Sequence, residues 1–369
     1  MANFGGVMSD GTPEWQEVMR GCDRWLASRR PLRAADRLRA AADALDPDDW
    51  PDHYGDGEVV AAFERRLAEL LGTEAAAVFP SGTMAQQVAL RIHCDARGAD
   101  TIAFHPTCHL ELHEHAGYQH LHGLRAELVG ARDRLITRED LDALHARLGA
   151  LLLELPQREI GGRLPEWEQL RSQLDWARER GIATHLDGAR IWEAAPYYER
   201  SPAELASLFD TTYVSLYKGL GGIGGSVLAG PAGLIDEARV WRRRHGGTQP
   251  QLFGFVAGAL PGLDGLAVRM PEFLAHARAL AGELREVPGL QLVPDPPQTP
   301  LFHLLLRGDR ESLEGRALEL ARERGVWLFG PLRPTEVDDV SRVEINIGEP
   351  ALEISPAEAG ELFSVVLAG

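Results

Sequence analysis

The chain has 369 residues, 44% hydrophobic and 25% charged, which is enough to bury a sizeable core and to form two domains. Its formal net charge of -17 argues against nucleic acid and anionic membranes as general partners, because these need patches rich in Lys and Arg. Three cysteines without CxxC spacing indicate neither a disulfide framework nor a cysteine zinc site. With no apolar run of membrane-spanning length and no export signal, we expect a cytoplasmic protein.

The first 50 residues are expected to form an N-terminal arm or helix. Residues 21–45 are rich in Ala, Leu and Arg and have a helical period. This segment ends at "DPDDWPDHYGDG", where Pro and Asp interrupt the pattern.

Residues 51–250 alternate between strand and helix patterns, and several strands are apolar throughout. This combination is typical of a mostly parallel sheet covered on both faces, whose functional site lies at the carboxyl ends of the strands. Gly72 closes the first helix, and Ser81 and Thr137 are candidate helix caps. Helices are expected over 58–72, 81–96, 108–119, 137–148 and 164–181, and strands over 75–80, 100–106, 126–131, 149–156, 182–189, 211–219 and 224–230.

After residue 250 the pattern changes to that of a smaller α+β domain, residues 251–369. Long amphipathic helices here are separated by single strands. Helices are expected over 271–287, 311–326 and 355–369, and strands over 301–308 and 341–348.

Ser81, Gly82 and Thr83 lie where a strand gives way to a helix. Free backbone N–H groups, hydroxyls and the positive end of the helix dipole suit a phosphate group there. The same residues are equally consistent with an ordinary turn that caps the helix and binds no phosphate.

Lys218 follows an apolar strand and precedes a glycine-rich loop, and Asp187 and Arg190 follow the neighbouring strand. A buried lysine loses its charge, finds a partner or becomes covalently engaged, for example as an imine. The Asp and Arg alone are equally consistent with a structural ion pair. Together with the phosphate cradle, they are the parts that a pyridoxal 5'-phosphate site needs.

Four segments carry a family resemblance: "YGDGEVVAAFERRLAELLGTEAAAVFPSGTMAQQ", "HLELHE", "HLDGARIWEAA" and "SLYKGLGGIGGSVLAG". The chain resembles the L-threonine aldolase and β-eliminating lyase family, fold type I of the pyridoxal phosphate enzymes, from about residue 52 to 250. The resemblance implies an α/β large domain with a mostly parallel, seven-stranded type of sheet and a small C-terminal α+β domain. It also implies a homodimer or homotetramer that acts on an amino acid.

The same resemblance implies the roles of individual residues. Lys218 matches the Schiff-base lysine, Asp187 the partner of the pyridine nitrogen, and Arg190 the arginine of that motif. The phosphate loop is matched by Ser81, Gly82 and Thr83, the ring-stacking histidine by His109, a nearby acidic residue by Glu114, and the receptor of the substrate carboxylate by Arg342.

The chain also departs from the family pattern. Tyr217 replaces a serine before the lysine, and "GGTQPQ" replaces a glycine-rich segment with an arginine. Gln157 stands where aldolases carry a histidine, after the retained Glu154, and His113 replaces an aromatic residue. Because an imidazole is lost at one position and gained at another, His113 is a candidate general base.

A histidine cluster between residues 105 and 122 includes the i, i+4 pair His109 and His113, but it lacks the HExxH order. We therefore expect no metal site. The expected reaction is retro-aldol cleavage of a β-hydroxy-α-amino acid to glycine and an aldehyde. Lys218 is the expected catalytic lysine, and His109, His113 or Glu114 could remove the β-hydroxyl proton, directly or through water. Alternatives are β-elimination or other Cα chemistry, or a weakly catalytic cofactor-binding protein.

Overall fold

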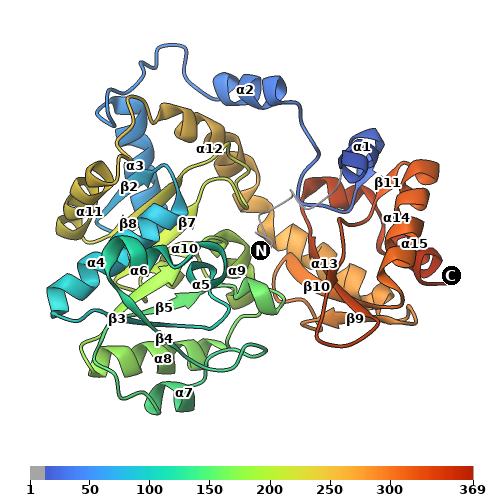
Figure 1. The fold of residues 1–369 in the computed structure, drawn as a ribbon. Coiled ribbons are helices and arrows are strands. Elements are labelled where there is room, and N and C mark those ends of the chain that lie inside the picture. The colour runs from blue at the N-terminus through green and yellow to red at the C-terminus, as the bar shows by residue number, and fades with distance from the viewer. Residues whose placement is uncertain (1–12, 369) are drawn as a thin grey trace. The chain divides into compact units, whose positions relative to one another are not determined.

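The computed structural model describes residues 13–368, which form two compact units (Figure 1). The larger unit comprises residues 33–159 and 164–268, and the smaller unit comprises 13–32, 160–163 and 269–368. The domain boundaries expected at residues 50 and 250 stay predictions.

A seven-stranded sheet forms the centre of the larger unit, with strand order β2-β8-β7-β6-β5-β3-β4 (Figure 1). β8 runs antiparallel to both of its neighbours, and the other pairs are parallel. The expected α/β class with a mostly parallel sheet is confirmed. The strands are β2 (Ala75–Phe79), β3 (Thr101–Phe104), β4 (Arg125–Leu128), β5 (Leu148–Glu154), β6 (Ala183–Asp187), β7 (Thr211–Ser215) and β8 (Ser226–Gly230).

The burial of the strands and the caps of the helices explain why the sequence forms the elements of the larger unit. β3, β6, β7 and β8 are buried at every residue, as expected for a sheet covered on both faces. The Ser81 hydroxyl accepts from the Met84 N–H at 3.3 Å, and Thr137 forms a capping box, so both expected caps are confirmed. The helices are α2 (Ala34–Asp43), α3 (Glu58–Leu71), α4 (Gly82–Arg97), α5 (His109–His113), α6 (Gly117–His122), α7 (Arg138–Asp142), α8 (Trp167–Glu179), α9 (Ile191–Tyr198), α10 (Pro202–Ala206), α11 (Ala232–Arg244) and α12 (Phe253–Gly265).

Three expected helices are wrong in extent. The segment 21–45 contains strand β1 (Arg24–Trp25), which pairs with a later strand, and only Gly21, the last residue of α1 (Pro13–Gly21), and α2 are helical. The segment 108–119 breaks into α5 and α6 because His115 and Ala116 adopt left-handed backbone conformations. The helix expected over 137–148 ends at Asp142, and α12 was not expected.

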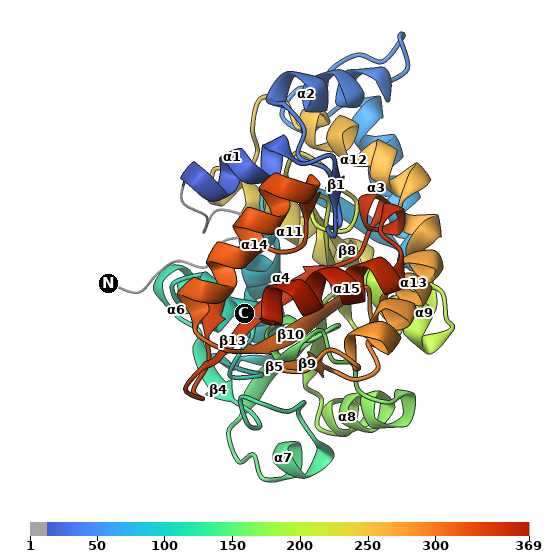
Figure 2. The same cartoon turned by 90° about the vertical axis from the view of Figure 1, so that its right-hand side faces the viewer.

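The smaller unit has an antiparallel sheet of order β12-β13-β10-β9 and a two-stranded parallel sheet of β1 and β11. Helices α13, α14 and α15 lie together, as Figure 2 shows. No helix within residues 13–368 is both long and apolar enough to cross a membrane. The elements are α1 (Pro13–Gly21), α13 (Met270–Leu284), β9 (Leu290–Val293), β10 (Leu301–Arg307), α14 (Arg310–Arg324), β11 (Val326–Trp327), β12 (Arg333–Pro334), β13 (Val340–Asn346) and α15 (Pro356–Leu367).

Candidate active site

The carboxyl ends of β5 and β6 bring two carboxylates side by side. Glu154 is the last residue of β5 and pairs in register with Asp187, the last residue of β6. Because adjacent residues of parallel strands project to the same face, both side chains lie at one sheet edge. Asp187 is 1% exposed, and its carboxylate accepts the Ala189 N–H at 3.1 Å. Burial and the neighbouring Asp187 raise the pKa of Glu154 to about 8.

Lys218 lies three residues after the end of β7. Its backbone N–H donates to the Ser215 hydroxyl at 3.2 Å, which fixes the turn that carries the lysine. Burial, followed by the nearby Arg190 guanidinium, lowers the pKa of the Lys218 amine to about 8, although Asp187 and Glu154 oppose this shift. The amine is therefore closer to its neutral, nucleophilic form than an ordinary lysine.

A glycine-rich loop behind Lys218 is held from two sides. A Cβ on Gly219 would come within 2.9 Å of both carboxylate oxygens of the buried Glu193. Arg37, from helix α2, donates to the carbonyls of Gly221 at 3.1 Å and Gly222 at 3.0 Å. Since the loop is packed closely and hydrogen-bonded, it provides a firm support for the lysine.

Arg190 lies at the N-terminus of α9, three residues after Asp187. Its side chain is buried, and the guanidinium Nε has no hydrogen-bond partner within residues 13–368. A buried guanidinium N–H without an acceptor destabilises the folded protein unless another group, such as a ligand, accepts its hydrogen bond. Tyr217 lies nearby, and burial, followed by the charge of Asp187, raises the pKa of its phenol.

The N-terminus of α4 lies against β7. A Cβ on Gly82 would come within 2.2 Å of the Tyr213 hydroxyl, so only glycine fits there. Gly82 and Thr83 belong to the first helical turn, whose N–H groups have no acceptor within the helix. This sequence-predicted cradle therefore offers backbone donors at a helix dipole's positive end.

The two histidines of α5, His109 and His113, each pair with a carboxylate. His109 Nδ1 is 3.0 Å from Glu114 Oε1, and Glu114 Oε2 accepts from Gln87 Nε2 at 2.8 Å. His113 Nε2 is 3.0 Å from Glu159 Oε1. The two imidazole rings are 5.0 Å apart, so the two pairs, which carry both of the histidines singled out in the sequence, lie side by side.

The Gln157 amide is occupied by structural hydrogen bonds. Its Nε2 donates to the Thr107 hydroxyl at 3.3 Å and to Glu154 Oε2 at 3.2 Å. Sequence reasoning noted this substitution, but it missed the roles of Glu159, Gln87 and Tyr213. The sequence did indicate that Glu154 belongs to the site, because Glu154 ends an apolar strand in the same way as Asp187.

Arg342 lies on β13 of the smaller unit, where it pairs in register with Leu305 and Arg333. Its expected role toward a substrate carboxylate stays a prediction.

The side chains of the histidine cluster do not all point to one place, since the His105 ring bonds to the Thr107 hydroxyl and to the Arg134 carbonyl. Within residues 13–368, no three His, Cys, Asp or Glu side chains gather as a metal site.

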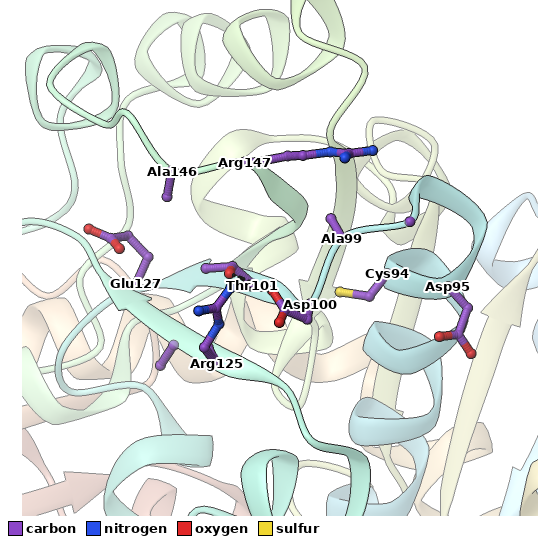
Figure 3. Close-up of a pocket in the computed structure, with 11 residues that line it drawn as sticks. Cys94, Asp95, Ala99, Asp100, Thr101, Arg125, Glu127, Ala146 and Arg147 are labelled. Carbon is purple, nitrogen blue, oxygen red and sulfur yellow. Dashed lines mark hydrogen bonds and ion pairs between the residues drawn. The ribbon is translucent and has the colours of Figure 1, made fainter.

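A separate cavity of about 730 Å³ lies at the opposite edge of the same sheet (Figure 3). It is lined by the first residue of β3, Thr101, and the first residue of β4, Arg125. Arg125 pairs with Asp100 at 2.7 Å, and Arg147 donates to the Arg97 carbonyl at 2.9 Å. Its charged groups are largely solvated, unlike those around Lys218.

The residues around Lys218 fit pyridoxal 5'-phosphate. The α4 N-terminus can hold the phosphate, Asp187 can pair with a protonated ring nitrogen, and the incomplete hydrogen bonding of Arg190 leaves a donor for an anionic oxygen. Lys218, with its lowered pKa, can form the imine. The donor set thus matches the chemistry of each part of the group.

Comparisons with known proteins agree with this chemistry. The sequence profile of the β-eliminating lyase family matches residues 33–304. A low specificity L-threonine aldolase from Escherichia coli O157:H7 is 34% identical over 265 residues, which cover 70% of this chain and 77% of the relative. A low-specificity L-threonine aldolase from Arabidopsis thaliana is 29% identical, covering 74% and 78%.

Solved structures show the same relationship. A chain from Listeria monocytogenes, proposed to be an L-allo-threonine aldolase, has a TM-score of 0.91 and 36% identity, covering 96% of this chain and 98% of its own. A chain from Exiguobacterium sp. 255-15, proposed to be an aromatic amino acid β-eliminating lyase or threonine aldolase, has a TM-score of 0.91 and 38% identity, covering 96% and 100%. The expected fold type I is therefore confirmed, and the chain belongs to the β-eliminating lyase family as a pyridoxal phosphate-dependent enzyme of the threonine aldolase type.

Proposed function

We propose that this enzyme cleaves the Cα–Cβ bond of a β-hydroxy-α-amino acid other than L-threonine by preference, giving glycine and an aldehyde. The observation that carries the proposal is the buried group of Lys218, Asp187 and Glu154 at one sheet edge, beside two imidazole–carboxylate pairs. When bound, pyridoxal 5'-phosphate supplies an electron sink for the bond that breaks at Cα.

In this proposal Lys218 binds the cofactor and moves protons at its Nζ atom. Asp187 keeps the pyridine nitrogen protonated, and Arg190 completes its hydrogen bonds on the cofactor or substrate. Ser81, Gly82 and Thr83 bind the phosphate. These roles are supported by the lowered pKa of Lys218, the burial of Asp187 and the unpartnered Arg190 Nε.

His109, His113 and Glu114 surround the reacting face in this proposal. His109 stacks on the cofactor ring while Glu114 fixes its orientation, and His113 takes the β-hydroxyl proton. Arg342 receives the substrate carboxylate as a bidentate partner. The hydrogen bond between His109 and Glu114 supports the first of these roles.

The substrate preference is tested by comparing kcat/KM for aldehyde release from L-threonine, L-allo-threonine and β-phenylserine. We expect L-threonine to be the poorest of the three, because Gln157 and His113 change the substrate side of the pocket. His113→Phe should lower kcat/KM by about 10²–10⁴, the usual contribution of a proton-transfer group. Efficient threonine cleavage that His113→Phe leaves unchanged would contradict the proposed preference.

β-Elimination is the second candidate, favoured by the likeness to the Exiguobacterium chain. Product analysis separates the two reactions, since elimination yields no glycine. Glycine and aldehyde in equal amounts would exclude elimination as the main reaction for that substrate.

We further propose that the enzyme is a cytoplasmic homodimer or homotetramer. Trp50 is 84% exposed and Leu38 is 61% exposed in the N-terminal part of the larger unit, and apolar side chains of this size favour burial against a second copy. The three cysteines are free thiols, as a reducing compartment requires. Sedimentation showing a monomer with full cofactor occupancy would contradict the oligomer.

A further inference from the structure

His113 and His109 expose opposite ring nitrogens. A carboxylate can only accept a hydrogen bond, so the His113 nitrogen facing Glu159, Nε2, carries the proton, and so does the His109 nitrogen facing Glu114, Nδ1. The unprotonated nitrogen is therefore Nδ1 in His113 and Nε2 in His109. The two imidazoles, on consecutive turns of one helix, thus present two different acceptor atoms.

Glu159 is itself held in place. Its Oε1 accepts from Arg158 Nη1 at 3.0 Å as well as from His113 Nε2 at 3.0 Å. The side chains of Arg158 and Glu159 are only 13% and 12% exposed. Because this ion pair is shielded from water, it fixes the carboxylate more firmly than a surface pair would.

The neighbouring position 157 cannot share the proton-transfer task. The Gln157 amide is committed to Thr107 and Glu154 and does not accept a proton near neutral pH. His113 bonds to Glu159, whose carboxylate also pairs with Arg158, and its ring lies 5.0 Å from that of His109, so we assign the proton exchange with the substrate to His113.

We propose that Glu159 is a positioning residue for the reaction: it holds His113 in the tautomer whose Nδ1 is free to take the substrate's β-hydroxyl proton. The inference rests on the proposed aldol function. The hydroxyl proton moves to Nδ1, the O–H electron pair becomes the second C=O bond of the aldehyde, and the Cα–Cβ pair stays with Cα. Lys218 Nζ then gives a proton to Cα, which completes glycine, and water carries the proton from His113 Nδ1 back to Lys218, so that no proton is gained or lost.

The test compares the holoenzyme with Glu159→Gln, Glu159→Asp, His113→Phe and the double variant Glu159→Gln/His113→Phe. Glu58→Gln is the matched control, because Glu58 also pairs with an arginine, Arg65, but in an exposed pair on α3. Thermal unfolding of each variant checks that it is folded. The measurements are kcat/KM against pH for the best β-hydroxy substrate, and 15N shifts of the histidine-labelled holoenzyme and its variants.

We expect Glu159→Gln to lower kcat/KM by about 10–100-fold and to move the acid limb of the pH profile down by about one pH unit, because the imidazolium loses its negative neighbour. Glu159→Asp should restore part of both effects. The double variant should be no slower than His113→Phe alone, since Glu159 acts through His113. In the 15N spectrum, the resonances lost in His113→Phe should show the Nε2–H tautomer in the wild type and a mixture in Glu159→Gln.

An unchanged pH profile and an unchanged tautomer in a folded Glu159→Gln protein would overturn the inference. So would a double variant much slower than His113→Phe, because Glu159 would then act independently. If the wild type releases no aldehyde from any β-hydroxy amino acid, the proposed function itself fails, and the tautomer measurement still reports whether Glu159 orients His113.

Discussion

Charged residues gather at both ends of the strands of the seven-stranded sheet: at the amino ends, called here the amino edge, and at the carboxyl ends, called the carboxyl edge. Only the carboxyl edge has the properties of a catalytic site. Arg125 and Asp100 lie at the amino edge (Figure 3), and their side chains are 69% and 57% exposed. At the carboxyl edge, Asp187 is 1% exposed and the pKa of both Glu154 and Lys218 is strongly shifted. Burial, and not the number of charges, distinguishes the reactive edge, because low polarity strengthens every interaction among charged groups.

The largest effect should come from removing the reactive group of the carboxyl edge. Lys218→Ala should lower turnover on the order of 10³-fold or more, because the residue that binds the cofactor covalently is lost. Borohydride should fix the cofactor to Lys218 in the wild type, as peptide mass analysis can check. A Lys218→Ala protein that still carried covalently fixed cofactor would refute the assignment.

A smaller effect should follow from filling the space at the α4 N-terminus. Gly82→Ala would place a methyl group within 2.2 Å of the Tyr213 hydroxyl, and overpacking of this kind costs about 1–3 kcal/mol. We expect a lower melting temperature and weaker cofactor affinity. Gly233→Ala is the matched control: Gly233 lies in α11 with nothing within 4 Å of its missing Cβ, so this change should be neutral or slightly stabilising. If Gly82→Ala and Gly233→Ala had the same melting temperature and the same cofactor affinity, the close approach of Gly82 to the Tyr213 hydroxyl would be contradicted.

Acid should weaken the interior between the two edges. His93 and His185 both lie 2.8 Å from the Thr211 hydroxyl, and burial lowers the pKa of His93 to about 4 and that of His185 to about 3. As pH falls below 6.5, these histidines bind protons in the unfolded chain but stay neutral in the folded protein. Stability is therefore lost from pH 6.5 down to about 4 through His93 and down to about 3 through His185. His93 alone contributes about 3 kcal/mol of this loss.

Melting temperatures measured from pH 8 to pH 4 check this expectation. His93→Gln should be less stable at pH 8 but should lose less stability on acidification than the wild type. Parallel curves for the two proteins would show that His93 does not stay neutral in the fold.

The smallest effect should come from the amino edge. Asp100→Asn breaks the ion pair with Arg125, which is exposed and screened, so activity and cofactor content should stay at wild-type levels. A large loss of turnover would show that the cavity of Figure 3 communicates with the reactive edge.

Much of this architecture could be predicted because strand polarity and capping are local signals. The apolar runs ending in Glu154 and Asp187, and the caps Ser81 and Thr137, are visible in short windows of sequence. Glu159 was missed because its hydrogen bond to His113 joins residues 46 positions apart. The break at His115 and Ala116 was missed because left-handed conformations of non-glycine residues are imposed by tertiary packing.

The order of strands in the large sheet has a consequence for synthesis of the chain. β2 is the first strand of this sheet to emerge, but it lies at an edge and pairs with β8, the last of the seven. At about 5–20 residues per second, roughly 150 residues of translation separate the two, so β2 waits on the order of 10–30 seconds for its partner. During that interval an apolar segment, "AAAVF", has unpaired backbone groups. Slower initiation or a lower growth temperature should therefore raise the yield of native enzyme, by reducing encounters between nascent chains.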